Sequence, residues 1–270
     1  MEPFVSVNAE LRHALSNNEN FAGAIDLRMA SAESIEKQVR ALIPIEDLRS
    51  TGSFFTGDVL ADKAVANLPD EINNHSICFD PTCGVGNLLI AASKKLFASS
   101  NLDETIELWG HQLRGFDLHP EFIECTKLRL INEAISRGAT KSKMSLEELE
   151  NRFIHIVAGD IFEHIEVLKT ASHLLVNPPY NLEKLEKPRP WAAGRVNMAA
   201  LFLDEIISGA SAQTSVTALL PDVLRSGTRY NRWRELVSSQ INVNIEIAGR
   251  FDSRTNVDVM NLFGRVRNAK

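Results

Sequence analysis

The sequence predicts an α/β fold: a doubly wound, mostly parallel seven-stranded sheet with a small helical appendage at its N-terminus. Two observations predict the sheet. From residue 76 onward, short apolar runs rich in β-branched or aromatic residues alternate with helical stretches, and the first run leads into a glycine turn. Strands that alternate with helices are typical of parallel sheets, because each helix returns the chain to the same edge. A third observation predicts the appendage: residues 8–48 show helical periodicity.

The N-terminal appendage is assigned to residues 1–48. Ile35, Val39 and Leu42 recur every three to four residues, as on one face of a helix, and Pro44 ends this run. A chain of 270 residues has room for one large domain with an appendage. We therefore assign residues 49–270 to a single main domain.

Seven apolar runs are predicted as strands, and most are separated by helical stretches. No clear helix separates the last two runs, so we expect an antiparallel hairpin at the sheet edge, joined through residues 249–256. Residues 99–112 and 138–150 fit the alternation poorly and are interpreted as surface connections, with Ser145 capping a short helix in the second. The predicted strands are residues 76–79, 113–116, 153–157, 173–176, 216–220, 243–248 and 257–263.

Composition excludes several classes of protein. A chain with 44% hydrophobic and 24% charged residues is neither fibrous nor disordered. It has no apolar run of about 18 residues, and its N-terminus lacks the basic-then-apolar order of a secretion signal, so we expect a cytoplasmic protein with no membrane partner. Cys78, Cys83 and Cys125 lack a C-x-x-C spacing and indicate neither a disulfide framework nor a metal site.

The net charge of −6 is unevenly distributed. Residues 177–270 hold 13 Lys or Arg against 9 Asp or Glu, whereas residues 1–176 hold 16 against 26. A basic surplus confined to one part of a chain favours a nucleic-acid-binding face there, although any division of a chain produces some asymmetry.

A glycine turn follows the first predicted strand and precedes a helical run; its sequence at residues 80–87 is DPTCGVGN. Gly84 and Gly86 remove side chains where the backbone must approach a ligand, and the following helix begins with unpaired N–H groups. The turn therefore resembles a nucleotide cradle, although glycine also punctuates strand-to-helix turns that bind nothing.

Two carboxylates follow the next two predicted strands. Asp117 ends the second strand, where an acid commonly receives ribose hydroxyls, and its alternative role is to cap the helix that begins after His119. Asp160 follows the third strand and is suited to accept a hydrogen bond from an adenine amino group, with Ile161 and Phe162 as apolar cover.

The tetrapeptide NPPY at residues 177–180 follows the fourth predicted strand. Its two prolines stiffen the backbone and leave carbonyls free. The side-chain oxygen of Asn177 and the carbonyl of Pro178 provide two fixed acceptors for the two hydrogens of a planar amino group. Tyr180 is suited to stack on the face of a planar substrate. The alternative is a proline-rich turn without chemistry.

Together, DPTCGVGN and NPPY resemble the cofactor and catalytic loops of DNA amino-methyltransferases. TGSFFT at residues 51–56 resembles a third cofactor element, and its place before the glycine turn is the order of the gamma class, which includes the modification subunits of type I restriction systems. The resemblance covers about residues 48–263 and implies the Rossmann-like fold of class I methyltransferases that use S-adenosylmethionine.

The resemblance also assigns site residues. Thr51, Phe54 and Thr56 would close over the methionine part of the cofactor. The remaining cofactor residues would be Asp80, Cys83, Gly84, Gly86, Asp117, Asp160 and Phe162. The catalytic loop would be Asn177, Pro178, Pro179 and Tyr180, and the target base would stack on Tyr180 and Phe251. Residues 197–207 would form the helix behind this loop, and no metal is implied.

The function implied is site-specific methylation of the exocyclic amino group of adenine in DNA, as the catalytic part of a modification or restriction-modification system. NPPY also occurs in methyltransferases that act on RNA bases or a protein glutamine, and a non-catalytic partner subunit would keep the same fold. Cytosine is a further possible target. The sequence ends soon after the last predicted strand, so we expect DNA recognition by a target-recognition domain or specificity subunit outside this chain.

Overall fold

The computed structural model describes residues 2–16, 57–250 and 257–268. Its main feature is a seven-stranded sheet with the order β3-β2-β1-β4-β7-β9-β8. The first five strands in this order are parallel, and β9 is antiparallel to both of its neighbours. The strands are β1 Cys78–Asp80, β2 Leu113–Asp117, β3 Ile156–Ala158, β4 His173–Val176, β7 Ser215–Pro221, β8 Asn244–Arg250 and β9 Asp258–Arg265. The predicted mostly parallel sheet is confirmed.

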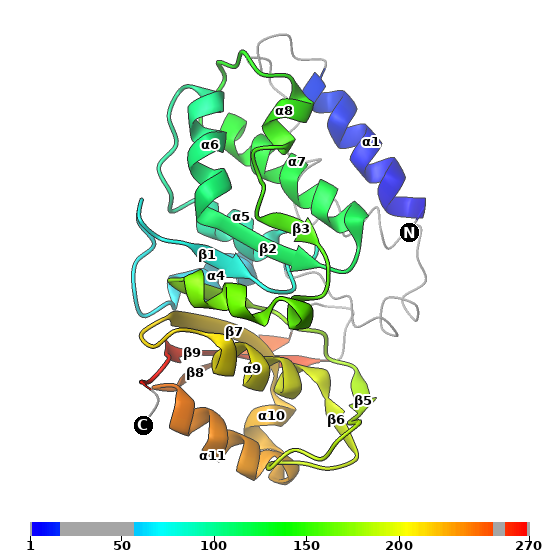
Figure 1. Ribbon diagram of the computed structural model, residues 1–270, viewed down its shortest axis with the longest axis vertical. Helices are drawn as coiled ribbons and strands as arrows, with labels where there is room; N and C mark the ends of the chain where they lie inside the picture. The colour runs from blue at the N-terminus through cyan, green and yellow to red at the C-terminus, as the bar shows by residue number, and fades with distance from the viewer. Residues whose placement is uncertain (1, 17–56, 251–256, 269–270) are drawn as a thin grey trace.

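Helices cover both faces of the sheet (Figure 1), which confirms the doubly wound arrangement. One layer contains α1 Glu2–Ser16, α4 Asp58–Ala66, α5 Asn87–Ser93, α6 Leu102–Gln112, α7 Pro120–Ser136 and α8 Leu146–Glu150. The other contains η2 Ile161–Glu163, η3 Ile165–Thr170, α9 Met198–Gly209, α10 Val223–Ser226, η4 Thr228–Tyr230 and α11 Asn231–Gln240.

Alternation along the buried strands separates two apolar cores. Cys78 of β1 belongs to the core under α5 and α7, whereas the adjacent Phe79 belongs to the core under α9 and α11. In β4, Leu175 packs on the first side and Leu174 on the second. Such near-continuous apolar strands are expected where helices bury both faces of a parallel sheet.

Residues 99–112 are not the surface connection that we expected. They contain α6, whose Leu102, Ile106 and Trp109 are fully buried in the first core. Asn101 caps this helix by accepting a hydrogen bond from the Glu104 amide. In the second stretch, the expected short helix is α8, and Ser145 forms its capping box.

The two C-terminal strands pair antiparallel, as predicted. β9, the last strand in the sequence, lies inside the sheet between β7 and β8, so β8 forms the edge. The residues that join them, 251–256, lie outside the described part of the chain.

A second, two-stranded sheet was not predicted. It consists of β5 Leu182–Lys184 and β6 Arg195–Asn197, which pair antiparallel directly after NPPY. Figure 1 shows this hairpin projecting beside α9.

Helix α1 is the described part of the N-terminal appendage. Val7, Leu11 and Leu15 are spaced by four residues, and all three are buried in the first core. Arg12 donates hydrogen bonds to Glu124 of α7 at 2.6 Å and to Glu150 of α8 at 2.6 Å, which hold α1 against these helices. The rest of the predicted helical region, residues 17–48, lies outside the described residues. Among the described helices, none has the length and apolarity needed to span a membrane.

Candidate active site

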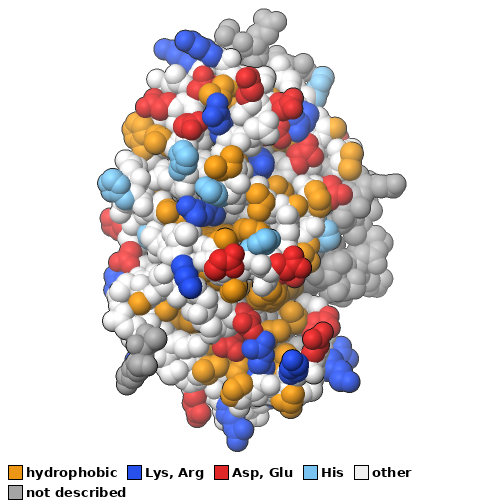
Figure 2. Space-filling model, viewed as in Figure 1, with side chains coloured by type: hydrophobic (Ala, Val, Ile, Leu, Met, Phe, Trp, Pro, Cys, Tyr) orange, Lys and Arg blue, Asp and Glu red, His pale blue; other side chains and the backbone are white. Residues whose placement is uncertain are grey.

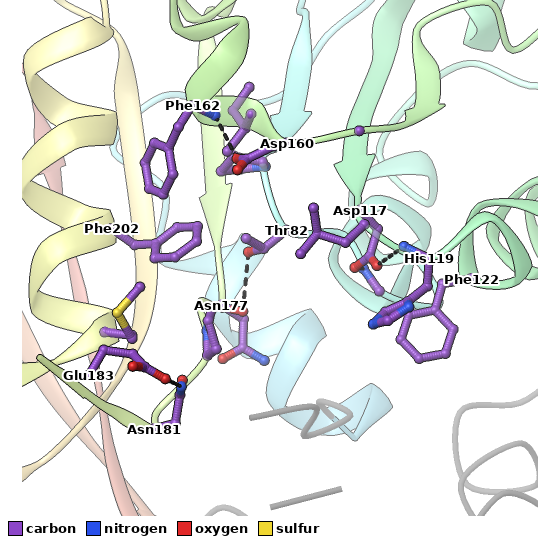
Figure 3. A pocket seen from close by; sticks show the side chains of 17 residues that line it. Thr82, Asp117, His119, Phe122, Asp160, Phe162, Asn177, Asn181, Glu183 and Phe202 are labelled. Carbon is purple, nitrogen blue, oxygen red and sulfur yellow. Dashed lines mark hydrogen bonds between the residues drawn. The ribbon is translucent and has the colours of Figure 1, made fainter. Parts of the chain in front are cut away.

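A cavity of about 410 Å³ opens at the carboxyl edge of the sheet (Figure 3). Residues that follow four adjacent parallel strands line it, which is where doubly wound folds bind ligands. The lining residues are Pro81, Thr82, Gly84, Asp117, Leu118, His119, Phe122, Gly159, Asp160, Ile161, Phe162, Asn177, Pro179, Asn181, Glu183, Met198 and Phe202. The structure therefore brings together six of the residues that the sequence singled out, and their roles stay predictions: Gly84, Asp117, Asp160, Phe162, Asn177 and Pro179.

Asp117 connects the end of β2 to the glycine turn. Its Oδ2 accepts a hydrogen bond from the Gly84 amide at 3.0 Å, and its Oδ1 accepts one from the His119 amide at 2.9 Å. Burial raises the pKa of the Asp117 carboxyl above its usual value. A carboxylate oxygen has two lone pairs, so each oxygen keeps one for a ligand. Asp117 thus orders the turn and remains suited to receive hydroxyl groups.

The two glycines of the turn are required for different reasons. Gly84 has a φ of 53° and open space around its missing side chain, so it leaves room in the cavity. Gly86 has a φ of 83°, and a Cβ there would lie 2.7 Å from Cγ2 of Thr126. Gly86 therefore allows α7 to pack closely against the start of α5, and it does not line the cavity.

A buried arginine supports the same turn. Arg129 of α7 is 2% exposed and donates hydrogen bonds to the main-chain oxygen of Val85 and to Oδ1 of Asn87. Asn87, the first residue of α5, thus provides an acceptor for this guanidinium. Sequence reasoning did not identify Arg129, because it lies 42 residues beyond its partner Asn87.

Asp80 and Cys83 lie beneath the cavity and do not line it. The Asp80 carboxyl is 2% exposed and accepts a hydrogen bond from the Thr82 amide at 3.0 Å. Burial, together with the nearby charge of Asp117, raises the pKa of Asp80 to about 8. Burial also raises the pKa of the Cys83 thiol well above its usual value, so this thiol is not a nucleophile at neutral pH.

Asp160 and Phe162 lie on one side of the cavity, and Asp117 and His119 lie on the other (Figure 3). Oδ1 of Asp160 accepts a hydrogen bond from the Phe162 amide at 2.9 Å. The rings of Phe162 and Phe202 have centroids 4.5 Å apart, which gives this side an aromatic wall. Such a wall beside a carboxylate suits a flat, apolar heterocycle with a hydrogen-bond donor.

Asn177 directly follows β4 and lines the same cavity. Its main-chain oxygen accepts a hydrogen bond from the Thr82 hydroxyl at 3.3 Å, which joins the catalytic loop to the glycine turn (Figure 3). Its side-chain oxygen lies 2.8 Å from the hydroxyl of Tyr180. Pro179 lines the cavity, whereas Pro178 is buried behind it.

The ring of Tyr180 packs against the second apolar core and is not among the residues that line the cavity. The helix predicted behind the catalytic loop is α9, and its N-cap Asn197 donates a hydrogen bond to the Tyr180 carbonyl at 2.9 Å. The stacking role expected of the Tyr180 ring stays a prediction. Four other predicted site residues, Thr51, Phe54, Thr56 and Phe251, lie outside the described residues.

Pro81, Thr82 and Gly159 lie in the glycine turn or next to Asp160 and were not predicted individually, and seven further lining residues were missed by sequence reasoning. Three of them, Leu118, His119 and Phe122, lie within five residues after Asp117. The rule that ligands bind beyond strand ends would therefore have included them. Phe202 is on the helix already placed behind the catalytic loop, but the sequence does not indicate which helix face meets the cavity. The remaining three are Asn181, Glu183 and Met198.

Comparison with known proteins identifies the family. The family model described as N-6 DNA Methylase matches residues 45–199, which is more than half of the chain. The chain belongs to the N-6 DNA methylase family. The glycine turn, Asp117, Asp160 and NPPY all fall within the residues that match this family model.

Solved structures of similar fold include two modification subunits. One, from a putative type I restriction enzyme of Vibrio vulnificus YJ016, is 16% identical with a TM-score of 0.54, and the match covers 87% of this chain and 50% of that one. The other, the M protein of the type I restriction enzyme EcoKI, is 17% identical with a TM-score of 0.56, covering 86% and 47%.

The DrdV–DNA complex also contains a similar chain, with 10% identity, a TM-score of 0.65 and coverage of 90% and 29%. These likenesses and the seven-stranded sheet confirm the predicted doubly wound α/β fold and its similarity to type I modification subunits. The chain spans about half the length of the two modification subunits that it matches.

Proposed function

We propose that this chain transfers a methyl group from S-adenosylmethionine to the exocyclic amino group of adenine in DNA, as the catalytic part of a modification system. Membership of the N-6 DNA methylase family supports the reaction class. The observation that carries the proposal is that Asn177 and Pro179 line the same cavity as Asp117 and Asp160. The Asn177 acceptor for an amino group and the polar groups for a nucleoside cofactor therefore share one space.

The cavity fits this cofactor. Its volume of about 410 Å³ lies within the usual range of about 300–1,000 Å³ for small-molecule sites. Asp117 would receive the ribose hydroxyls, and Asp160 would accept from the adenine amino group while Phe162 and Phe202 cover the ring. Gly84 leaves space for the rest of the molecule. When bound, the cofactor supplies an electrophilic methyl group on a positively charged sulfur.

The catalytic loop would position and activate the target amino group. The Asn177 side-chain oxygen and the Pro178 carbonyl would accept its two hydrogens, which concentrates the nitrogen lone pair toward the cavity. This requires no strong base, and orientation of the reactants supplies much of the rate, up to about 7–11 kcal/mol. In duplex DNA the target base is stacked and its amino group is paired, so the base must leave the helix to reach the loop.

Recognition of a DNA sequence would require protein outside these 270 residues. This part of the proposal rests on the length of the relatives, since the chain spans about half of the modification subunits that it matches. A target-recognition domain or specificity subunit would deliver the duplex to the cavity.

The proposal is tested by methyl transfer from labelled S-adenosylmethionine to duplex DNA, structured RNA and protein in parallel, with calorimetry of cofactor binding. Asn177→Ala should keep cofactor affinity within about twofold and lose most transfer to DNA, because the acceptor acts only on the bound amino group. Transfer only to RNA, or only to protein, would mean that this molecule and not DNA is the substrate. Cofactor binding without any transfer would support a non-catalytic subunit instead.

A further inference from the structure

The β5–β6 hairpin is fixed rigidly beside the catalytic loop. At its base, the Met198 amide donates to the Asn181 carbonyl at 2.9 Å, and the Asn197 amide donates to the Tyr230 hydroxyl at 3.1 Å. At its tip, Nε1 of Trp191 donates to Oδ2 of Asp204 in α9 at 2.8 Å. A hairpin bonded at both ends presents its side chains in a fixed position relative to the cavity.

The two faces of this hairpin differ. Glu183 and Val196 are paired across the strands on the inner face, where Glu183 lines the cavity and Val196 is fully buried. Because side chains alternate along a strand, the next pair, Lys184 and Arg195, lies on the outer face. Both of these cations are exposed.

A third cation joins this pair. Arg229, in η4, donates a hydrogen bond to the main-chain oxygen of Arg195. Among the described residues, no carboxylate forms an ion pair with Lys184, Arg195 or Arg229. We call these three residues the hairpin cations. Arg189, on the same hairpin, is different because it pairs with Glu205 of α9.

Lys184 and Arg195 lie directly opposite each other in the register, and like charges in this position destabilise a strand pair. Each strand has only three residues, so this pair of cations makes up a third of the paired positions. The arrangement is stabilised when an anion lies over the pair. Arg229 adds a guanidinium, which matches the oxygens of a phosphate.

We propose that the hairpin cations bind the phosphate backbone of duplex DNA beside the flipped target base. This inference rests on the proposed function, because it assumes that a base enters the cavity whose rim includes Asn181 and Glu183. Phosphate contacts of this kind hold the register and orientation of a duplex without reading its sequence. The hairpin would thus set how far the catalytic loop lies from the strand that carries the target.

The test compares a triple variant, Lys184→Gln, Arg195→Gln and Arg229→Gln, with a control, Lys95→Gln and Arg267→Gln. The control residues are exposed and form no ion pair among the described residues. Lys95 follows the C-terminal end of α5, and Arg267 follows β9 near the first residue of β7. For each protein, affinity for one fluorescent duplex is titrated across a range of salt concentrations, and cofactor affinity is measured by calorimetry. A second, scrambled duplex and a double-stranded RNA are titrated alongside.

We expect the slope of log affinity against log salt to fall by about 0.9 for each cation removed, and so by about 2.7 in the triple variant. Both DNA duplexes should be affected equally, and cofactor affinity should not change. The control should match the wild type. An unchanged slope in the triple variant, or an equal change of slope in the control, would overturn the inference. Methylation of DNA by the wild type would then still support the proposed function. Preferential loss of RNA binding would assign the surface to RNA. A wild type that methylates no DNA would instead refute the proposed function.

Discussion

The hydroxyl of Tyr180 lies 2.8 Å from the side-chain oxygen of Asn177 and 3.1 Å from the main-chain oxygen of Leu219. A hydroxyl has one hydrogen, so it donates to one of these oxygens at a time. A bond to Asn177 holds its side-chain oxygen in one orientation, whereas a bond to Leu219 holds the tyrosine against β7 instead. The hydroxyl is therefore placed to control the acceptor on which the proposed reaction depends.

Tyr180→Phe should therefore lower methyl transfer by about two- to tenfold, the effect of losing one hydrogen bond of roughly 0.5–1.5 kcal/mol. Cofactor affinity should stay constant, since the hydroxyl does not line the cavity. Tyr180→Ala should lose far more transfer, because the ring packs against the second core. Steady-state kinetics with calorimetry distinguish these outcomes, and a phenylalanine variant with wild-type kcat would show that the hydroxyl is unimportant.

Asp80→Asn should stabilise the protein without cofactor. The folded-state pKa of Asp80 is raised to about 8, so between about pH 4 and 8 the unfolded chain ionises this group while the folded protein keeps it protonated. Stability therefore falls as pH rises through this window, and asparagine removes that loss. We expect a gain on the order of 3 kcal/mol at pH 7 and almost none at pH 4.

Urea titrations at the two pH values measure this difference. The resemblance assigns Asp80 to the cofactor, whose positive charge would favour the ionised carboxylate over the protonated form that the free protein holds. The same variant should therefore bind S-adenosylmethionine more weakly. A variant that gains stability and keeps full affinity would remove Asp80 from the proposed cofactor site.

Asp70 should stabilise the fold at neutral pH and lose this effect in acid. Hydrogen bonds from Arg265 and Ser215 lower the pKa of Asp70 to about 2, below its unfolded value. Its contribution is therefore present above about pH 4 and is lost as pH falls toward 2. The side chain is 42% exposed, so solvent screening limits the contribution to about 1 kcal/mol. Asp70→Asn should lower the free energy of unfolding by that amount at pH 7, and the two proteins should converge near pH 2.

Gly84→Ala and Gly86→Ala form a matched pair. Both positions have a positive φ, which costs a non-glycine residue about 1 kcal/mol. A Cβ at Gly84 meets nothing within 4 Å, whereas one at Gly86 meets Thr126 at 2.7 Å. Thermal unfolding should show a loss of about 1 kcal/mol for the first variant and roughly 1–3 kcal/mol more for the second. Equal losses of stability in the two variants would mean that α7 can move away from the turn at little cost in free energy.

The buried parallel strands could be predicted well from the sequence. The predicted run 173–176 coincides with β4 because a strand covered by helices on both faces is apolar throughout. Helix α6 was missed, although Leu102, Ile106 and Trp109 have helical spacing and Asn101 is a good N-cap. It continues into β2 without a turn residue, so no local signal separates the two elements. The three-residue strands β5 and β6 have no pattern long enough to detect.

The candidate site was predictable where chemistry follows a strand end, as with Asp117 and Asn177. The sequence does not indicate contacts made across the fold. The Arg129 guanidinium on Asn87, and the Phe202 ring against Phe162, depend on how α7 and α9 pack on the sheet. Such packing angles are set by the whole core, so periodicity alone does not supply them.

The position of β9 within the sheet affects how the protein is made. During synthesis the ribosome releases β8 before β9, yet the partner of β8 in the sheet is β9. Until residues 258–265 emerge, one edge of β7 is unpaired and β8 has no partner strand. Exposed strand edges attract other chains. The nascent protein is therefore exposed to pairing with other chains until β9 joins β7 to β8.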